Sequence, residues 1–473
     1  MGAQWIHGQV GNILYEYGME NNLIVDPTED FGFEGIGSFC SEDGILVNCD
    51  DLYEMIAYLD RAKEMNQCED KFDQPINMYD FFRYEFDEFI SKRSYVSKGN
   101  LKLLKQAFRW FILFELIDNG CDSIRKLSPL SYTEWKDYDG VDLINLHNGY
   151  GALLKQLENE FPLEQMVQLK SAVRKIMPFV DGNKIKIKLQ IEKLLYTDEK
   201  ATNFTVKETN ESIFDHVIIT SSIGFLKANL NNDFFNFLLP KDKVDVIRSL
   251  GYGTINKIFL YFNEPFWFDD EKGFQVIWSS IIDENCYDYE CRTNEIDQFN
   301  QKFPKWVYYI SGFDLVGERQ PNMMLAWIGS IGAIEMEKET DEQIRLTIGD
   351  VLQQIIPRSR RSTKLVPTPD RVYISRWHSN PFTLGSYSNR TIDYEQLQCD
   401  GSKSLKHNID VLAKPIYSGD IITQMETISE SDCPKILFAG EATDLEHYST
   451  TDGAFRSGIR EAQNLINYYQ TKS

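Results

Sequence analysis

The sequence predicts an α/β fold, and three stretches carry that prediction. Residues 436–439 form a short apolar run that stops at Gly440, as a buried strand does, and apolar residues then recur at helical spacing from 459 to 469. Residues 185–196 alternate between apolar and polar side chains, which is typical of a strand. Residues 101–114 repeat apolar side chains every three or four positions, as a helix does. The 473 residues are enough for two domains around a large core.

The composition is that of a globular protein with an acidic surface. The chain is 42% hydrophobic and 26% charged, and its 72 acidic and 49 basic side chains give a net charge of −23. Such an excess of negative charge disfavours a nucleic-acid partner and favours the attraction of polycations. Because no apolar run approaches the roughly 18 residues of a membrane-spanning helix, we expect no membrane partner.

The cysteine pattern indicates a reducing compartment. The eight cysteines show no Cys-x-x-Cys pair and no other spacing typical of a metal site or a disulfide framework; they stand at positions 40, 49, 68, 121, 286, 291, 399 and 433. The first 20 residues contain no basic region followed by an apolar one, as a secretory signal would. We therefore expect a cytoplasmic protein without a bound metal ion. The oligomeric state stays open.

The first 146 residues are expected to be mainly helices and loops. Apolar residues between Gly11 and Leu23 predict a short helix, and residues 27–51, rich in Gly, Asp, Glu and Ser, predict loops and a hairpin. Residues 52–146 are mostly helical by their apolar period. Their aromatic stripe is interpreted as core rather than as a cofactor site, because helices use such stripes to pack.

The next hundred residues predict a return to mixed helices and strands. The glycine turn at Asn148–Gly151 leads into a helix, and the alternating strand at 185–196 follows. Residues 215–220 form an apolar run that ends in a turn of small residues, which predicts a further buried strand.

One charged residue, Lys257, stands in the apolar and aromatic run from 251 to 262. Lysine is among the side chains least often buried. In a strand, its face-mates would be apolar or aromatic, namely Ile255, Phe259 and Tyr261. The ammonium group would then point into an apolar wall, where burial lowers its pKa, or leave at the end of the strand. A lysine paired with a nearby carboxylate is the alternative.

The C-terminal strand, loop and helix offer polar groups to a ligand. The helix is expected to begin between Thr451 and Gly453, at the hydroxyl pair of Thr450 and Thr451. The free N–H groups and positive dipole end of a helix favour an anionic or electron-rich ligand, and a glycine there removes side-chain bulk. Glu441, at the exit of the strand, is placed to bind a sugar hydroxyl. A plain capped helix on a strand is the alternative, since such junctions are common.

Four stretches resemble the FAD-dependent amine oxidases and, within them, the polyamine oxidases. They are Gly2-Ala-Gln-Trp-Ile-His-Gly8, Gly251-Tyr-Gly-Thr-Ile-Asn-Lys-Ile-Phe-Leu-Tyr-Phe262 continuing to Pro265-Phe-Trp267, Arg376-Trp-His-Ser-Asn-Pro-Phe-Thr-Leu-Gly-Ser-Tyr-Ser388, and Phe438-Ala-Gly-Glu-Ala-Thr443 followed by Tyr448-Ser-Thr-Thr-Asp-Gly453. The matches run from residue 2 to about 468 in the order of the family. The resemblance therefore covers nearly the whole chain.

The resemblance implies a role for each candidate residue. It implies that Lys257 holds a water against the flavin N5, and that His7 lies in the substrate channel as a second catalytic residue. Tyr387 would line the amine entrance, where an aromatic ring can bind an ammonium group. The implied FAD-binding residues are Gly440, Glu441, Thr450, Thr451, Trp377 and, through its backbone at the adenine, Ile191. A packed histidine behind Trp5, and core positions for the aromatic residues, are the alternatives.

The resemblance also implies a segment that this sequence does not show. In the family, a strand, a Gly-x-Gly-x-x-Gly turn and a helix bind the FAD pyrophosphate upstream of the stretch that matches residues 2–8. The glycine pairs at 35 and 37, 149 and 151, and 251 and 253 all lack the third glycine. We therefore expect an FAD domain without its first βαβ unit and a poorly soluble or colourless chain. An upstream segment of roughly 30 or more residues should restore flavin binding.

The implied fold is two interleaved domains. The FAD-binding, Rossmann-like domain would comprise residues 1–26, 147–245 and 425–473, and a substrate-binding domain of mixed sheet and helices would comprise 27–146 and 246–424. The implied reaction is the oxidation of a polyamine (spermine, spermidine or an acetylated form) with oxygen to an aldehyde, an amine and hydrogen peroxide. The sequence leaves open whether the polyamine is acetylated and which C–N bond is cleaved.

Two alternative functions stay open. One is a truncated or inactive relative that keeps the fold without binding FAD. The other, weaker one is an oxidase of the histone lysine demethylase type, which usually carries a long inserted helical hairpin. No charged heptad run of that length stands in this sequence.

Overall fold

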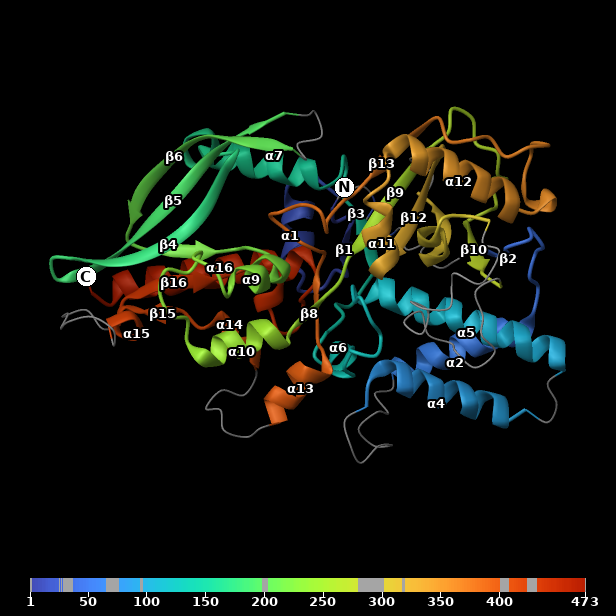
Figure 1. Cartoon of the computed structure of the whole chain (residues 1–473), viewed down its shortest axis with the longest axis horizontal. Coiled ribbons are helices and arrows are strands. Elements are labelled where there is room, and N and C mark those ends of the chain that lie inside the picture. Colours follow the sequence, from blue (N-terminus) through green and yellow to red (C-terminus); the bar gives the residue numbers. More distant parts are fainter. Residues whose placement is uncertain are drawn as a thin grey trace.

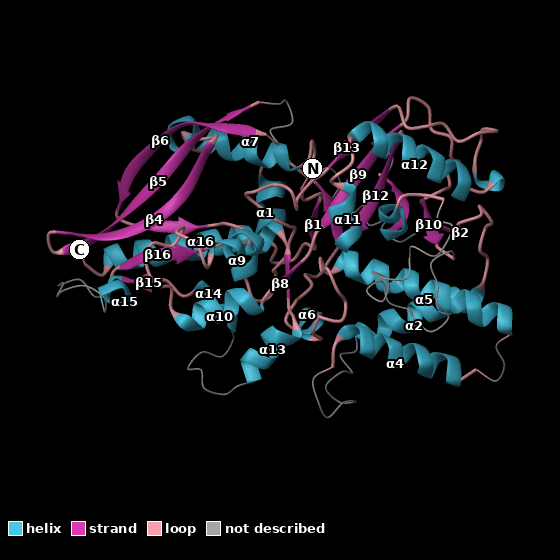
Figure 2. Ribbon diagram, viewed as in Figure 1, coloured by secondary structure: helices cyan, strands magenta, loops and turns pink. Residues whose placement is uncertain are grey.

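The computed structural model describes residues 2–24, 26, 28, 37–64, 76–93, 97–197, 203–279, 302–316, 320–399, 408–422 and 432–472. Helices and strands are mixed along this part of the chain (Figure 2), which confirms the predicted α/β class. The elements gather into two lobes, and the N-terminus lies between them (Figure 1). The N-terminal residues are therefore placed to contribute to a site between the lobes.

One lobe is built on a six-stranded sheet with the order β13-β9-β12-β11-β10-β2. Its strands are β2 (Ser38–Ser41), β9 (Ile255–Tyr261), β10 (Gly273–Ile277), β11 (Ile310–Leu315), β12 (Met323–Gly329) and β13 (Arg371–Ile374). Neighbours are antiparallel except β10 and β2, which are parallel. The predicted loop and hairpin at 27–51 thus contains a strand of the sheet, because pairing with a distant strand leaves no local signal.

Helices surround this sheet. They are α2 (Asp50–Glu64), α4 (Met78–Ser91), α5 (Lys98–Asp118), α6 (Leu130–Thr133), α11 (Ser330–Met336) and α12 (Asp341–Ile355), with the 3₁₀ turns η3 (Lys305–Tyr309) and η4 (Arg358–Arg360). Leu104, Phe108 and Phe111 of α5 are fully buried in the core, which confirms that its aromatic stripe packs. The prediction that residues 52–146 are mostly helical is confirmed by α2, α4, α5 and α6, and residues 143–145 form a short strand within this range.

The other lobe holds two three-stranded sheets, with the orders β4-β5-β6 and β15-β16-β7. Their strands are β4 (Ser171–Asp181), β5 (Lys184–Tyr196), β6 (Phe204–Phe214), β7 (Val217–Ile219), β15 (Ile416–Tyr417) and β16 (Pro434–Phe438). The helices are α7 (Tyr150–Glu160), α8 (Leu163–Met166), α9 (Ile223–Asn229), α10 (Lys241–Ser249), α13 (Ile392–Cys399), α14 (Asn408–Ala413), α15 (Ser418–Ile422) and α16 (Thr451–Gln470). The buried strand β16 and the start of α16 at Thr451 confirm the predicted strand, loop and helix.

Short elements lie between the lobes (Figure 1). They are β1 (Trp5–His7), which pairs with β3 (Leu143–Asn145), α1 (Ile13–Glu20), and β8 (Gly251–Tyr252), which pairs with β14 (Ser388–Asn389). The 3₁₀ turn η5 (Glu441–Thr443) follows β16. Three of the four stretches that resemble the amine oxidases thus contribute to these central elements.

The buried apolar residues form two large clusters. The first draws on residues 39–127 and 255–374, and the second on 176–250 and 394–442. The predicted domain boundaries stay a prediction, and residues 27, 424 and 425 lie outside the described residues. Buried residues between 394 and 421, assigned above to the substrate domain, pack in the second cluster.

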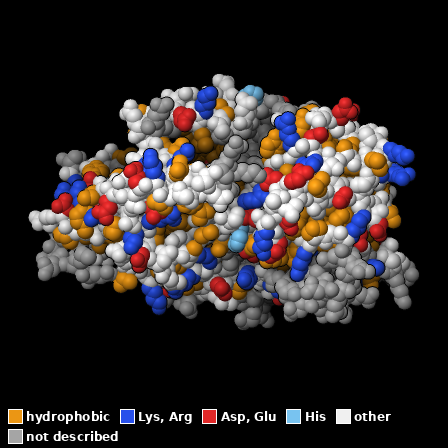
Figure 3. Space-filling model, turned by 45° about the horizontal axis from the view of Figure 1, so that its top comes forward, with side chains coloured by type: hydrophobic (Ala, Val, Ile, Leu, Met, Phe, Trp, Pro, Cys, Tyr) orange, Lys and Arg blue, Asp and Glu red, His pale blue; other side chains and the backbone are white. Residues whose placement is uncertain are grey.

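The surface and the cysteines add three findings for the described ranges. Charged side chains of both signs are interspersed on the face shown in Figure 3. None of the described helices combines the length and the apolarity needed to cross a membrane, and no three His, Cys, Asp or Glu side chains in these ranges are grouped to hold a metal ion. Cys40, Cys49, Cys121 and Cys433 are free thiols, whereas Cys68, Cys286 and Cys291 lie outside the described residues.

Candidate active site

Lys257 lies on β9 against two indole rings. Its Nζ is 4.5 Å from the centroid of the Trp327 ring and 5.2 Å from that of Trp5. It also donates hydrogen bonds to the carbonyl oxygen of Gly2, at 3.1 Å, and to Oε1 of Gln4, at 3.3 Å. The side chain is buried, with 7% of the residue exposed. The ammonium group therefore points into an aromatic wall, where cation–π contacts stabilise its charge.

The indole N–H groups of Trp5 and Trp327 are further hydrogen-bond donors near Lys257. Trp5 and Trp327 stack with their centroids 6.2 Å apart, and the Nε1 atom of each is buried without a hydrogen-bond partner among the described residues. A buried donor without an acceptor is costly. The two unpartnered indole N–H groups therefore belong to rings that pack against the Lys257 ammonium, and donors of this kind suit an electron-rich acceptor such as a water.

The backbone around Lys257 is fixed by the segment that follows β13. The Lys257 N–H donates to Oγ of Ser375 at 2.8 Å, and the Ser375 N–H donates back to the Lys257 carbonyl at 3.0 Å. The Trp377 N–H donates to Oδ1 of Asn256 at 3.2 Å. A Cβ atom on Gly2 would lie 3.9 Å from the Trp377 indole. Trp377 thus joins the Lys257 cluster through the N-terminal segment.

His7 lies on β1 within electrostatic reach of this cluster. Its ring meets the Trp135 ring edge-on, with centroids 6.4 Å apart. Burial lowers the pKa of the imidazole, and the charge on Lys257 lowers it further, against the influence of Asp142. The imidazole is therefore neutral at neutral pH and able to accept a proton.

The contacts that the structure describes for Tyr387 and Ile191 do not include Lys257. The Tyr387 hydroxyl donates to the carbonyl oxygen of Ile117 at 2.8 Å, and a Cβ atom on Gly120 would lie 2.2 Å from its ring. Tyr387 therefore packs against the end of α5. Ile191 is half-buried on β5, where it pairs with Val173 and Asn210.

An acidic cluster at the end of α5 escaped the sequence analysis. Nζ of Lys63 lies 2.5 Å from Oε1 of Glu115, and the Tyr132 hydroxyl donates to the other oxygen of Glu115 at 2.6 Å. Asp118, one turn later, is exposed to solvent. Burial raises the pKa of its carboxyl to about 6, against the charge on Lys63. Asp142 acts on Asp118 and on His7, so the acidic cluster borders the His7 side of the site.

A signal for this cluster does stand in the sequence. Phe108, Phe111, Glu115 and Asp118 follow one another at helical spacing. Two carboxylates therefore continue a face that is otherwise apolar. Charged side chains on the buried face of a helix are rare unless they have partners or a function.

Glu441 joins two of the matched stretches. Its carboxylate accepts hydrogen bonds from the Ser388 N–H at 3.2 Å, from the Ser388 hydroxyl at 2.7 Å and from the Ser449 N–H at 2.7 Å. Burial raises the pKa of this carboxyl, and these hydrogen bonds oppose the rise. A carboxylate has about four acceptor positions, so one position on Oε1 is left for a ligand hydroxyl.

Gly440 precedes Glu441 with a positive φ of 118°. A Cβ atom there would meet only ordinary contacts, the nearest at 3.8 Å. The glycine is therefore required by the backbone angle and not by a lack of space.

The start of α16 is tied to its own loop. The Thr450 hydroxyl accepts from the Gly453 N–H at 3.0 Å and donates to the His447 carbonyl at 2.7 Å. A Cβ atom on Gly453 would lie only 2.0 Å from that carbonyl oxygen. Gly453 is therefore required because the loop before the helix folds back onto it, and the opening of the helix N–H groups to a ligand stays a prediction.

Thr451 and Asp452 connect α16 to the rest of the site. The Thr451 hydroxyl lies 2.6 Å from that of Tyr150, which donates to the Trp5 carbonyl at 2.7 Å. This chain of hydrogen bonds links α16 to the Lys257 cluster. Oδ2 of Asp452 accepts from Tyr138, whereas the buried Oδ1 has no partner among the described residues.

These residues fit one end of FAD. The unpartnered donors of Trp5 and Trp327 suit the edge of a flavin ring, and the free acceptors of Glu441 and Asp452 suit hydroxyl groups. The 473 residues contain no Gly-x-Gly-x-x-Gly turn, the motif that binds a pyrophosphate in dinucleotide-binding folds. The fit therefore concerns the flavin and the ribityl chain.

Comparisons with known proteins show the family of the chain. Residues 1–466 match the family model of the flavin-containing amine oxidoreductases. The human peroxisomal N(1)-acetyl-spermine/spermidine oxidase is 34% identical over 255 residues, which are 54% of this chain and 43% of that protein. Its bovine counterpart is 27% identical over 495 residues, which cover 100% of this chain and 86% of that protein.

Solved structures agree on the fold. Wild-type putrescine oxidase bound to putrescine has a TM-score of 0.58 at 13% sequence identity, and the match covers 98% of this chain and 88% of that one. At this level of identity the likeness concerns the fold alone.

Proposed function

Because the chain belongs to the flavin-containing amine oxidoreductases, and is thus an FAD-dependent oxidoreductase, we propose that it oxidises polyamines with molecular oxygen. The substrate is spermine, spermidine or an acetylated form, and the products are an aldehyde, an amine and hydrogen peroxide. The observation that carries this proposal is the position of the Lys257 ammonium against two indoles, within electrostatic reach of His7.

The reacting amine must lose a proton before it is oxidised. Polyamine nitrogens are protonated at neutral pH, and a protonated nitrogen has no lone pair. His7, whose pKa is lowered by burial, is neutral and accepts this proton. A bound FAD, which Glu441 and Trp377 would help to hold, would supply the oxidising chemistry: it would accept a hydride equivalent from the carbon beside the nitrogen, and oxygen would reoxidise it.

Lys257 serves both the oxidation of the amine and the hydrolysis that follows it. Its ammonium group and the N–H groups of Trp5 and Trp327 hold a water by its oxygen. This water adds to the C=N bond of the substrate imine, whose C–N bond then breaks to leave the aldehyde and the amine. The same donors stabilise negative charge that develops nearby.

Asp118 binds the part of the substrate that does not react. Above pH 6 its carboxylate is charged, and a second ammonium group of the polyamine forms an ion pair with it. The aromatic ring of Tyr387 serves the amine entrance. A monoamine has no second ammonium group, so it gains nothing from Asp118.

The cofactor-binding residues are proposed from the same geometry. Glu441 binds a ribityl hydroxyl through its remaining acceptor position, Trp377 lies at the flavin, and the turn at Gly440 presents the carboxylate. The Thr450 hydroxyl already forms hydrogen bonds within its own loop. Thr450 and Thr451 therefore contribute the backbone at the start of α16 to the cofactor, and not free hydroxyl groups. Ile191 contributes its backbone to the adenine.

A peroxide assay on the FAD-loaded protein tests the proposal. We expect turnover of spermine, spermidine or N1-acetylspermine, and little turnover of tyramine or of a dimethyl-lysine histone peptide. Turnover of tyramine but not of any polyamine would contradict the substrate, and preference for the peptide would favour the demethylase alternative. A correctly folded protein that never binds FAD would favour the inactive relative.

The cytoplasm is the proposed location, on the basis of the cysteine pattern and the N-terminal residues. The human and bovine relatives are named as peroxisomal enzymes, so the peroxisome is the competing compartment. The distribution of a fluorescent fusion with a peroxisomal marker decides between them. The two interleaved domains stay part of the same proposal.

A further inference from the structure

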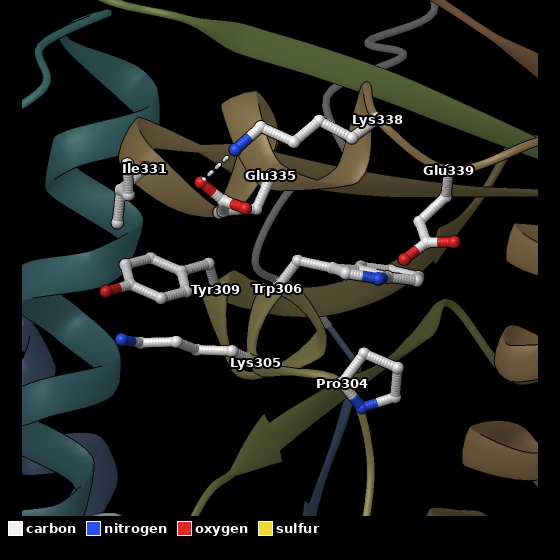
Figure 4. Close-up of a pocket in the computed structure, with 9 residues that line it drawn as sticks. Pro304, Lys305, Trp306, Tyr309, Ile331, Glu335, Lys338 and Glu339 are labelled. Atoms are coloured by element: carbon white, nitrogen blue, oxygen red, sulfur yellow. Dashed lines mark hydrogen bonds and ion pairs between the residues drawn. The ribbon is translucent and has the colours of Figure 1, made fainter. Parts of the chain in front are cut away.

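A pocket of about 420 Å³ lies between η3 and α11, in the lobe of the six-stranded sheet (Figure 4). One wall comes from η3 and the residue before it, and the other from α11 and the turn after it. The ammonium group of Lys305 points away from Glu339, and that of Lys338 pairs with Glu335 at 2.6 Å (Figure 4). The described residues of this pocket therefore offer no single place for a charged ligand.

Arg390, directly after β14, is a cation enclosed entirely by protein. It is 0% exposed and is among the largest fully buried side chains of the described residues. Its Nε donates to Oε2 of Glu134, at the end of α6, at 2.7 Å, and the Glu134 side chain is only 8% exposed. The cost of taking two charges out of water can exceed their attraction. A buried ion pair is therefore weak evidence for a role in stability.

The ion pair of Arg390 and Glu134 is also incompletely hydrogen-bonded. Nη1 of Arg390 and Oε1 of Glu134 are buried without a hydrogen-bond partner among the described residues. A buried polar atom without a partner costs about 1–3 kcal/mol. The pair is therefore not an optimised salt bridge, and its other contacts indicate a different role.

The guanidinium group of Arg390 also contacts the loop that follows η5. Its Nη2 donates to the carbonyl oxygens of Asp444, at 3.3 Å, and Leu445, at 3.4 Å. Its face packs on the Tyr448 ring, with Cζ 3.7 Å from the ring centroid. The Tyr448 hydroxyl donates to the Ser131 carbonyl at 2.7 Å. Arg390 thus contacts three residues of one loop at the same time.

This loop and the segment before Arg390 supply the donors that hold Glu441. The Ser449 N–H, next to Tyr448, donates to the Glu441 carboxylate at 2.7 Å. Ser388, two residues before Arg390, donates to the same carboxylate through its N–H and its hydroxyl. Ser449 has a positive φ of 65°, which a non-glycine residue keeps only where its surroundings hold it. Arg390 therefore joins the two segments that fix the direction of the Glu441 carboxylate.

The charge of Arg390 also acts on Glu441. Burial raises the pKa of the Glu441 carboxyl, and the hydrogen bonds from Ser388 and Ser449 oppose the rise. The positive charge of Arg390 opposes it as well. An ionised carboxylate accepts hydrogen bonds through both oxygens, whereas a protonated one also carries a donor. The guanidinium group thus favours the form of Glu441 that can accept a ligand hydroxyl.

We propose that Arg390 is a positioning residue for the cofactor. It holds residues 444–449 in place, so that Ser388 and Ser449 fix the Glu441 carboxylate and its remaining acceptor position stays free for a ribityl hydroxyl. This inference rests on the proposed role of Glu441 in FAD binding. The contacts that the structure describes for Arg390 do not include Lys257, so the binding of the amine should not depend on Arg390.

Two variants of the full chain and a control test this role. Arg390→Met combined with Glu134→Met replaces the buried pair by apolar side chains, a change that is often neutral for stability or stabilising. Arg390→Lys keeps the charge but lacks the planar fork that contacts Glu134 and the loop together. The control is Arg109→Met, which removes another buried arginine, 2% exposed, from α5.

A fluorescence titration with FAD measures the effect on the cofactor. The double variant should bind FAD about tenfold more weakly than the parent and Arg390→Lys about three- to tenfold more weakly, whereas Arg109→Met should stay within about twofold. At saturating FAD, the KM for spermine should change less than about twofold, because Arg390 acts on the cofactor alone. Unchanged FAD affinity in the double variant would overturn the proposal, as would an equal loss in the control. If the double variant fails to fold, Arg390→Lys decides in the same way.

Amide hydrogen exchange without FAD separates this inference from the proposed reaction. Exchange at residues 444–450 should be about tenfold faster in the double variant, or in Arg390→Lys, than in the parent, and unchanged in Arg109→Met. Equal exchange in the parent and the Arg390 variants would overturn the positioning role. A parent that never binds FAD, while its Arg390 variants lose protection in this loop, would contradict the proposed function and support the role of Arg390 in holding the loop.

Discussion

Replacement of Asp118 by Asn separates the substrate role of this residue from its effect on stability. The substitution keeps the shape of the side chain and removes its charge. Burial raises the pKa of the Asp118 carboxyl from 3.8 to about 6, so the group is ionised at neutral pH in a place that opposes its charge. The proposed reaction uses this charge to bind the second ammonium group of a polyamine.

The loss in binding follows from the contact that is removed. A hydrogen bond to a charged group is worth about 1.5–3 kcal/mol, which corresponds to an increase of about 10- to 150-fold in KM. For the unchanged protein, KM should rise as the pH falls through about 6, because Asp118 then takes up a proton. The Asn variant should lose this pH dependence.

The effect on stability has the opposite sign. Because the pKa is raised on folding, the folded state binds the proton more tightly, and stability falls as the pH rises from 3.8 to about 6. The rise in pKa from 3.8 to about 6 corresponds to about 3 kcal/mol, which we reduce to about 1–2 kcal/mol because the side chain is exposed to solvent. Asp118→Asn should therefore raise Tm by about 1–2 °C at pH 8 and leave it unchanged at pH 4.

Steady-state kinetics with spermine from pH 5 to 9 and thermal denaturation at the two extremes measure both effects. The control is Asp87→Asn, which removes an exposed carboxylate that pairs with Arg83 on α4. A variant with unchanged KM, or one less stable than the parent at pH 8, would refute the reasoning for Asp118. An equal effect of the control would show that net charge alone is responsible.

Three further predictions concern the flavin side. Lys257→Met should slow flavin reduction by about 10²–10³-fold in stopped-flow experiments without changing the FAD content, and an unchanged rate would remove Lys257 from the chemistry. Glu441→Gln should weaken FAD binding about tenfold in a fluorescence titration, because the new amide NH₂ group would face the N–H and hydroxyl donors of Ser388 and Ser449. Retained affinity would argue against the role of Glu441 at the ribityl chain. Gly453→Ala should destabilise the protein to urea by about 1–3 kcal/mol, since its Cβ would lie 2.0 Å from the His447 carbonyl, whereas Gly458→Ala, in open space on the same helix, should be neutral or stabilising. Equal effects of the two alanines would contradict this account.

Local patterns predicted the elements that carry the site. The stop at Gly440, the apolar run of β16 and the helical period of α16 all depend on residues close together in the sequence. The same holds for β5 and for the start of α7 after Gly149. These elements were therefore accessible to sequence reasoning.

Contacts between distant strands were not accessible in this way. The sequence named Ile255, Phe259 and Tyr261 as companions of Lys257, whereas the ammonium group meets Trp327 and Trp5. Trp327 lies opposite Lys257 only because β12 and β9 pair in one register. Trp5 comes from the other end of the chain.

The hydrogen-bond partners of the polar groups in the C-terminal loop also depend on tertiary structure. The Thr450 hydroxyl was available in the sequence, but the folded loop satisfies it with the His447 carbonyl. Ser388 could not be recognised as the partner of Glu441, because 53 residues separate the two. The acidic cluster at the end of α5 was visible as a helical pattern, but its proximity to His7 depends on the fold.

The central claim is that the chain is an FAD-dependent oxidase whose reductant is a polyamine. Anaerobic titration of the FAD-loaded protein with spermine, followed by its visible absorption spectrum, tests it most directly. The account predicts that spermine abolishes the absorption of oxidised flavin, that tyramine does not, and that admitted oxygen restores the spectrum with the formation of hydrogen peroxide. An unchanged spectrum after spermine, its acetylated form and spermidine would contradict the account.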